Sequence, residues 1–236
     1  MLLALASGAW LLRKSQRDLS LPSGHRIAIG ISAFCGAMLG AKLPFVLSDW
    51  PGLLSGAAWF SSGKTILCGM VAAYFSVELA KWALEIKTKT GDSFAVPVAV
   101  SVAIGRLGCL TAGCCYGIPT NLPWGMRCAI VDDLVRHPTQ LYEFVFHASM
   151  AVLMTMLIRR NIWKGQIVKL YILSYLVYRI ATETIRPEAR YSFGLTAYQW
   201  FALAMIPVFV YLWYRDSQSA ALARLTSVEE QVDPIP

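Results

Sequence analysis

Two clusters of ionisable and small residues bracket one loop of this chain, between residues 105 and 143. The first cluster places Arg106 directly after an apolar segment and continues into glycines and cysteines. The second packs Arg, His, Gln, Tyr and Glu into eight positions, from Arg136 to Glu143, at the start of another apolar segment. Charged side chains within hydrocarbon cost about 2.5–3.5 kcal/mol each on membrane-insertion scales. Two costly clusters around one loop therefore predict a functional site.

The arginines indicate that this site binds an anion. Guanidinium groups match phosphate oxygens with two parallel hydrogen bonds. Arg186 precedes Pro187, where a helix must end or bend, so its side chain is predicted to be free to meet an anion. The small residues of the first cluster either allow close helix packing or turn backbone N–H groups toward an anion, and the two uses are compatible. These glycines are Gly105, Gly108, Gly113 and Gly117.

Two histidines and one glutamate are the candidate proton carriers. His137 stands beside Arg136 at the mouth of its apolar segment, which favours an acid–base or phosphate-contact role. Glu143 is the alternative proton acceptor. His147 follows Glu143 by four residues on the same helical stripe, and its more common use is interhelical hydrogen bonding.

A second polar stripe runs along a later apolar segment. Tyr175, Arg179 and Glu183 follow one another at intervals of four, and Arg186 follows three residues later. Such spacing places them on one face of a helix. Arg179 and Glu183 are predicted to neutralise each other, and both a structural ion pair and a functional role remain open.

Six cysteines leave three kinds of chemistry open. Cys35 and Cys68 lie in apolar runs and are interpreted as small core residues. The cysteine spacing does not match a zinc finger or ribbon, and two adjacent cysteines are not expected to chelate one ion easily, so no metal site is predicted. A disulfide joining Cys128 to one of the adjacent pair, or passive packing, is favoured over a thiolate nucleophile. The cysteines of the loop are Cys109, Cys114, Cys115 and Cys128.

Composition supports an all-α, polytopic membrane bundle. Of 236 residues, 56% are hydrophobic and only 15% are charged, which is too apolar for an ordinary soluble domain. The net charge of +7 is attributed to basic residues in cytoplasmic loops and not to nucleic-acid binding. Seven apolar spans of about 20 residues or fewer are predicted. They cover residues 2–12, 27–47, 65–84, 94–112, 138–158, 166–184 and 195–214.

The distribution of Lys and Arg predicts the orientation. Alternate loops differ in basic content, and the denser set is assigned to the cytoplasm. The N-terminus is then outside and the C-terminus inside. Residues 1–215 are predicted to form one transmembrane domain and residues 216–236 a weakly ordered cytoplasmic tail. The loop from 105 to 143 and the loop carrying Arg186 are predicted to share the outer face.

Several of these strings together resemble the bacterial prolipoprotein diacylglyceryl transferase family, over most of the chain from residue 63 onward. The most specific element runs from His137 to Glu143. The resemblance rests on Gly105-Arg106, Gly113, Gly117, Pro123-Trp124, Arg136-His137-Pro138-Thr139-Gln140-Leu141-Tyr142-Glu143 and Arg179, Glu183, Arg186-Pro187.

The resemblance implies a transferase of the bacterial inner membrane, without a cofactor, whose site faces the periplasm. Such enzymes move a diacylglyceryl group from phosphatidylglycerol to a cysteine thiol of a prolipoprotein and release glycerol phosphate. By resemblance, Arg106 and Arg186 hold the phosphoryl group and Gly117 shapes the loop. His137 and Glu143 are the predicted catalytic acid–base residues. The other residues predicted to bind substrate are Gly105, Arg136, Gln140, Tyr142, Arg179 and Glu183.

Three positions depart from the family pattern. Cys109 stands where the family has Asn, Ala112-Gly113-Cys114 replaces Asn-Gly-Glu, and Leu67 replaces a histidine. A divergent member with the donor-binding arginines retained is therefore predicted. The alternatives are the same donor lipid with a different acceptor, including transfer through Cys114 or Cys115, and a phospholipid-binding or transport protein without catalysis.

Overall fold

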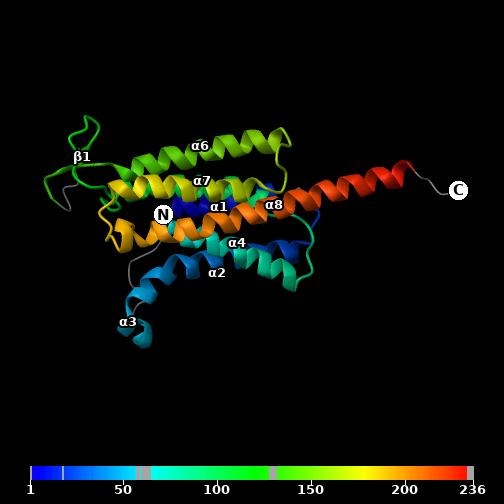
Figure 1. Cartoon of the computed structure of the whole chain (residues 1–236), viewed down its shortest axis with the longest axis horizontal. Coiled ribbons are helices and arrows are strands. Elements are labelled where there is room, and N and C mark those ends of the chain that lie inside the picture. The colour runs from blue at the N-terminus through cyan, green and yellow to red at the C-terminus, as the bar shows by residue number, and fades with distance from the viewer. Residues whose placement is uncertain (1, 18, 57–58, 60–64, 128–131, 233–236) are drawn as a thin grey trace.

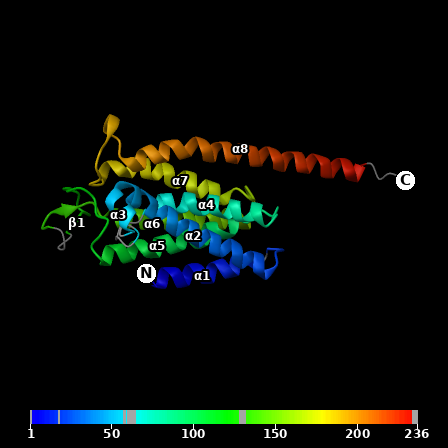
Figure 2. The ribbon, with the colours of Figure 1, turned by 90° about the horizontal axis from the view of Figure 1, so that it is seen from below.

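The computed structural model describes residues 2–17, 19–56, 59, 65–127 and 132–232. Most of these residues form long helices that run side by side (Figures 1 and 2). Each of the seven apolar spans predicted from the sequence falls on one helix. The helices are α1 (Leu2–Gln16), α2 (Ser23–Ser48), α3 (Trp50–Ser55), α4 (Ile66–Ala83), α5 (Asp92–Thr111), α6 (Thr139–Arg159), α7 (Ile167–Thr182) and α8 (Ala197–Val232), with short 3-10 turns η2 (Glu183–Ile185) and η3 (Ser192–Gly194).

Within the described residues, five helices are long and apolar enough to cross a membrane. They are α2, α4, α5, α6 and the first part of α8. The helices α1 and α7 have 15 and 16 residues, shorter than the roughly 20 that a bilayer core requires. The prediction of a polytopic helical membrane protein is confirmed. Seven crossings and the orientation stay predictions.

One end of the bundle collects the connections that matter for the site. The segment between α5 and α6 lies there, with a two-stranded antiparallel ribbon of β1 (Met126–Arg127) and β2 (Val135–Arg136). The turn η2 that follows α7 lies at the same end (Figure 1), and the backbone N–H of Ile118 donates to the carbonyl of Ile185 at 2.9 Å. The prediction that these two loops share one face is therefore confirmed.

The last helix is longer than the sequence suggested. Where a weakly ordered tail is predicted from residue 216, α8 continues to Val232 and extends beyond the rest of the bundle (Figure 1). Residues 216–232 contain no Gly or Pro, and ten of these 17 residues are Ala, Leu, Glu, Gln or Arg, which are strong helix formers.

Small residues let α2 and α4 approach closely. A Cβ atom added at Gly40 would lie 2.2 Å from the Cβ of Ala72, and one at Gly36 would lie 2.4 Å from the Cβ of Ser76. Across the same pair of helices, the hydroxyls of Ser32 and Ser76 lie 2.8 Å apart. Close packing of small residues is a common way for helices to associate within a membrane.

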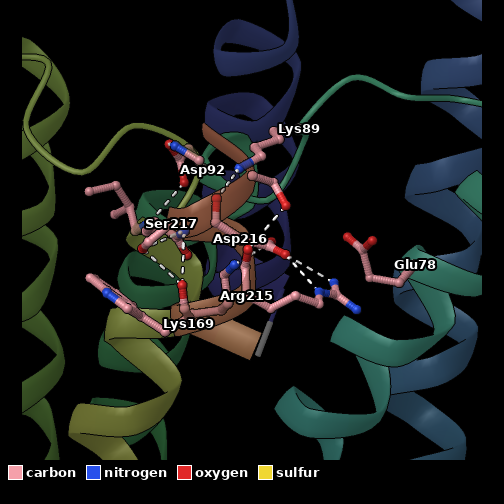
Figure 3. A network of polar contacts seen from close by, with 12 residues as sticks. Glu78, Lys89, Asp92, Lys169, Arg215, Asp216 and Ser217 are labelled. Carbon is pink, nitrogen blue, oxygen red and sulfur yellow. Dashed lines mark hydrogen bonds and ion pairs between the residues drawn. The ribbon is translucent and has the colours of Figure 1, made fainter. Parts of the chain in front are cut away.

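A polar network ties α5, α7 and α8 together at the end away from the β1–β2 ribbon (Figure 3). The buried Nζ of Lys169 lies 2.6 Å from a carboxylate oxygen of Asp216. The carboxylate of Asp92 accepts from the backbone N–H groups of Gly165 at 2.5 Å and Ile167 at 2.9 Å. The Asp92 contacts join the start of α5 to the start of α7, and the Lys169–Asp216 pair joins α7 to the middle of α8. These contacts therefore hold the three helices in position at the end opposite to the candidate site.

The close packing of α2 against α4 gives a matched pair of substitutions. Gly40→Ala places a methyl group against Ala72 and is expected to lower the free energy of unfolding by about 1–3 kcal/mol. Gly30→Ala in the same helix meets nothing within 4 Å, so it is expected to be neutral or slightly stabilising. Thermal unfolding midpoints in detergent compare the two. Equal midpoints would contradict the assigned packing.

Candidate active site

Glu143 is the centre of a buried ionic cluster. Its carboxylate, 1% exposed, lies just inside the first turns of α6. One oxygen, Oε1, accepts from Nη1 of Arg186 at 2.8 Å and from Nη1 of Arg179 at 3.1 Å. The other oxygen, Oε2, pairs with Nη2 of Arg106 and accepts from the hydroxyl of Tyr175 at 3.3 Å. A single carboxylate thus receives four donors.

Each arginine reaches this carboxylate from a different place in the chain. Arg106 comes from the last turns of α5, Arg179 from the last turn of α7, and Arg186 from the residue directly after η2. Arg179 also pairs with Glu183 at 2.5 Å, which confirms the predicted pair at that spacing. Arg186, which the sequence analysis left free to meet an anion, contacts Glu143 instead.

The cluster has an excess of positive charge and unused donors. Among its arginine and glutamate side chains, three guanidinium groups face two carboxylates, an excess of one positive charge before the nearby Cys115 thiol is counted. Within the described residues, the Nε atoms of Arg106, Arg179 and Arg186 are buried and have no hydrogen-bond partner. Buried donors without partners cost roughly 1–3 kcal/mol each. Such a site is suited to receive an additional anion.

Deeper in the bundle, His147 takes the structural role favoured by the sequence. Its ring is fully buried, and Nδ1 lies 2.7 Å from the hydroxyl of Tyr171. It therefore joins α6 to α7 beneath the ionic cluster.

The segment after α5 is held against the start of α6 by backbone hydrogen bonds. The N–H of Gly117 donates to the carbonyl of His137 at 2.9 Å, and the N–H of His137 donates to Ile118 at 3.1 Å. A Cβ at Gly117 would lie 2.7 Å from the Cβ of His137 and 2.8 Å from the carbonyl oxygen of Ile185. At Gly105, by contrast, a Cβ would meet nothing within 4 Å. Close packing thus requires glycine at 117 and not at 105.

Arg136 supports the loop from its own side. Its Nη2 lies 2.5 Å from the carboxylate of Asp132, its Nη1 donates to the carbonyl of Gly117 at 3.2 Å, and it stacks on Tyr116 with 5.1 Å to the ring centre. The hydrogen bonds from Arg136 lower the pKa of Asp132. These contacts shape the loop around the site, although the sequence analysis predicted that Arg136 binds substrate.

A chain of aromatic and polar side chains marks the mouth of the site. The indole Nε1 of Trp124 donates to the hydroxyl of Tyr142 at 2.9 Å, and Nδ1 of His137 lies 3.3 Å from the same hydroxyl. Next to them, Nε2 of Gln140 donates to the carbonyl of Cys114 at 2.5 Å. The predicted residues His137, Gln140 and Tyr142 therefore lie on one side of the loop, above the ionic cluster.

Three cysteines converge beside Arg106. The Sγ atoms of Cys109, Cys114 and Cys115 all lie within 4.8 Å of one another, and all three thiols are free. The sequence analysis did not expect the adjacent pair to chelate one ion easily, but the sulfur atoms of Cys114 and Cys115 lie 3.8 Å apart in a turn where Cys115 has a φ of +63°. Cys128, the predicted disulfide partner, lies outside the described residues.

The neighbouring groups make Cys115 the most acidic thiol of this cluster. A hydrogen bond from Cys109 and the charges of Arg106 and Arg186 lower the pKa of Cys115 to about 5, against the opposing effect of burial. Burial and the negative charge of Cys115 raise the pKa of Cys114.

An apolar cavity of about 600 Å³ opens between α2, α4 and the start of α8. Its walls include Leu43, Phe75 and Phe201, and it also touches Tyr198. The ring of Tyr198 also contacts Arg179, with 5.2 Å between the guanidinium carbon and the ring centre. Tyr198 thus belongs to the wall of the cavity and also contacts the arginine cluster.

A family model described as Prolipoprotein diacylglyceryl transferase matches residues 1–215. The chain belongs to the prolipoprotein diacylglyceryl transferase family. This membership confirms the resemblance drawn from the string that ends at Glu143.

Curated relatives with the name phosphatidylglycerol–prolipoprotein diacylglyceryl transferase support the membership. The protein of Clostridium tetani is 27% identical over 199 residues, which cover 80% of this chain and 79% of the relative. That of Legionella pneumophila strain Corby is 32% identical over 179 residues, covering 72% of this chain and 66% of the relative. That of Dehalococcoides mccartyi strain CBDB1 is 26% identical over 231 residues, covering 89% and 86%.

Sequence reasoning missed two contributors to the ionic cluster and its loop. Tyr175 was placed on the polar stripe but given no role, although its interval of four from Arg179 points it toward the same neighbours. Asp132 was not considered, although it precedes Arg136 by four residues. No local sequence pattern indicated that Arg106 and Arg186 both contact Glu143.

The ionic cluster predicts a large effect for one isosteric change. Glu143→Gln removes the negative charge shared by three guanidinium groups, and we expect the free energy of unfolding to fall by about 3–5 kcal/mol. Glu78→Gln, which alters the partly exposed pair with Lys81, is expected to cost no more than about 1 kcal/mol. Thermal unfolding in detergent measures both. A small shift for Glu143→Gln would show that the arginines do not depend on this carboxylate.

Proposed function

We propose that this chain is a bacterial inner-membrane enzyme that transfers a diacylglyceryl group from phosphatidylglycerol to the cysteine thiol of a prolipoprotein, in lipoprotein biosynthesis. The observation that carries this proposal is the buried three-arginine cluster beside an apolar cavity. A phosphatidylglycerol molecule combines the two features that these sites recognise, an anionic phosphate and long acyl chains. The family membership and the names of the relatives support the same reaction.

The donor lipid binds with its chains in the cavity and its phosphate at the arginines. Leu43, Phe75 and Phe201 offer apolar surface to an acyl chain. Arg106 and Arg186 offer guanidinium N–H groups in the planar arrangement that suits phosphate oxygens. Tyr198 lies at the boundary between the two. This arrangement supports Arg106 and Arg186 as the residues that hold the phosphoryl group.

The reaction is a substitution at the glycerol carbon that bears the phosphate. The acceptor thiolate attacks this carbon, a carbon–sulfur bond forms, and the carbon–oxygen bond to phosphate breaks. Glycerol phosphate leaves with the bonding electron pair. Fixed guanidinium groups stabilise the negative charge that develops on this leaving group, without having to reorganise during the reaction.

His137 is the residue that we assign to accept the proton of the acceptor thiol. It lies at the mouth of the site, and its Nδ1 is held near the Tyr142 hydroxyl. Glu143, the other predicted proton acceptor, already receives four donors and is a weak base in that setting. We therefore assign Glu143 to positioning the arginines. Glu183 holds Arg179 in the same way.

A different acceptor is the second candidate function. Cys109, Cys114 and Leu67 occupy positions where the family pattern has polar residues. Cys109 and Cys114 lie beside the cluster, with the Sγ of Cys109 4.0 Å from Nη1 of Arg106. A changed acceptor surface with the donor site retained favours the same donor lipid and a thiol or other nucleophile outside a prolipoprotein.

The proposed orientation places the N-terminus and this site on the periplasmic side and the C-terminus in the cytoplasm. The Lys and Arg distribution supports it. In this orientation the site faces the outer leaflet of the inner membrane and the periplasm, where exported acceptors are found.

A transfer assay in proteoliposomes tests the function. The vesicles contain phosphatidylglycerol labelled in its glycerol headgroup, and the acceptor is a lipobox peptide with one cysteine. Release of labelled glycerol phosphate together with lipidation of the peptide supports the proposal. Release without lipidation indicates another acceptor. Lipid binding without release indicates a non-catalytic binding or transport protein.

Substitution of the donor-binding arginines should remove turnover. In this assay Arg106→Lys and Arg186→Lys are each expected to lower the rate by about 100-fold or more, because a point charge does not replace a bidentate guanidinium. Arg127→Lys, an exposed position of β1, is the matched control and should retain the parental rate. Equal rates in all three variants would refute the assigned phosphate site.

The two glycines that the sequence analysis grouped together should differ. Gly117→Ala forces His137 and the turn after α7 apart, so we expect it to reduce transfer by about 10-fold or more at an intact unfolding midpoint. Gly105→Ala faces open space and should change the rate by less than about twofold. The opposite ranking of the two rates would contradict the loop geometry.

A further inference from the structure

Three thiols beside the ionic cluster have no role in the transfer reaction described above. The Sγ atoms of Cys109, Cys114 and Cys115 lie within 4.8 Å of one another, and those of Cys114 and Cys115 are 3.8 Å apart. Transfer to an external thiol requires no enzyme cysteine. Transfer through one of these thiols would leave a stable carbon–sulfur bond on the enzyme. A different chemistry therefore has to explain why three sulfur atoms meet.

The spacing of the sulfur atoms matches a shared metal ion. Two thiolates bound to one ion at about 2.3 Å are separated by roughly 3.8 Å around a tetrahedral centre and roughly 4.0 Å around a trigonal one. The Cys114–Cys115 separation already has this value. Small side-chain rotations would bring Cys109 to the same distance from the other two.

The backbone holds this arrangement in place. The carbonyl of Cys115 accepts from the buried Thr139 hydroxyl, and the carbonyl of Cys114 accepts from Gln140 at 2.5 Å. The N–H of Cys114 donates to the carbonyl of Cys109 at 3.2 Å. A positive φ at Cys115, which is uncommon outside glycine, is maintained by these contacts. The three sulfur atoms thus belong to an ordered turn.

The surrounding charges select the kind of ion. Three thiolates around one cation carry net negative charge, and Arg106, whose Nη1 is 4.0 Å from the Sγ of Cys109, offsets it. Glu143, whose carboxylate shares Arg106 with these thiols, is engaged by three arginines and offers no oxygen ligand to Ca²⁺ or Mg²⁺. Thiolate ligands favour soft cations such as Cu⁺ and Zn²⁺.

We propose that Cys109, Cys114 and Cys115 form a three-sulfur binding site for a thiophilic d¹⁰ cation, Zn²⁺ or Cu⁺. Cys114 is exposed, and Cys109 and Cys115 are half-buried, so the ion enters from the mouth of the site. A disulfide would use only two of the sulfur atoms and leave the third unexplained. With Zn²⁺, three protein ligands leave one coordination position for water, as in catalytic zinc sites.

Competition titration of the full-length protein tests the site. The protein is purified in detergent, reduced, stripped of metal, and titrated with Zn²⁺ against a chromophoric chelator and, in a separate anaerobic arm, with Cu⁺. One equivalent of one cation should bind, and the arm with the tighter binding identifies the ion. X-ray absorption at the edge of the bound metal should then count three sulfur ligands.

Serine variants show whether these thiols are the ligands. Cys109→Ser, Cys114→Ser and Cys115→Ser should each weaken binding by at least about 100-fold, since even outer-shell changes at metal sites cost 10–100-fold. Cys35→Ser, which removes an exposed thiol in α2, is the control and should bind like the parent. Unfolding midpoints without metal show that the variants are folded.

The outcome against the site is equally clear. Binding that survives all three serine variants, or fewer than three sulfur ligands in the absorption spectrum, overturns it. The proposal is also overturned if the reduced protein binds neither cation and the protein purified without reductant contains a disulfide among these cysteines. Metal binding is measured without lipid or acceptor, so a failure of the transfer assay leaves these results unaffected.

Discussion

Glu143 places one carboxylate among three guanidinium groups inside a helical bundle, and the end of the bundle that carries the loop is arranged around it. Charges are expensive to remove from water, and a cluster of opposite charges persists there only when its members are well paired. Arg106, Arg179 and Arg186 arrive from α5, α7 and the turn after α7. The carboxylate therefore does more than balance charge, because it connects α6 to α5, to α7 and to the residue that follows η2.

Polar contacts gather near both ends of the bundle, with largely apolar packing and the His147–Tyr171 hydrogen bond between them. Toward the ribbon end lies the Glu143 cluster, and at the other end Lys169 and Asp216 join α7 to α8 (Figure 3). Between them, α7 packs with Tyr171, Ile172 and Leu176 against its neighbours. Because α7 takes part in both networks, its register is determined at two levels, and the direction of Arg179 follows from that register.

Local features of this structure could be predicted from the sequence, whereas its long-range contacts could not. Apolar length located the helices, and an interval of four residues was enough to pair Arg179 with Glu183. The contacts of Glu143 with Arg106 and Arg186 join residues 37 and 43 positions apart, and no periodicity reports on them. The cysteines are grouped in a turn with positive φ values at Gly113 and Cys115, and a sequence pattern does not show this conformation at Cys115.

The depth of the arginine cluster has a consequence for the lipid itself. If Asp92 and Lys169 mark one membrane surface, Arg106 lies about 21 Å along α5 from that surface and Arg179 about 15 Å along α7, at 1.5 Å per residue. A hydrocarbon core is about 30 Å thick, so the cluster lies roughly 9–15 Å below the opposite surface. A donor phosphate that reaches these arginines must sink beneath the headgroups around it, and the protein then replaces the water and counterions that the lipid leaves behind.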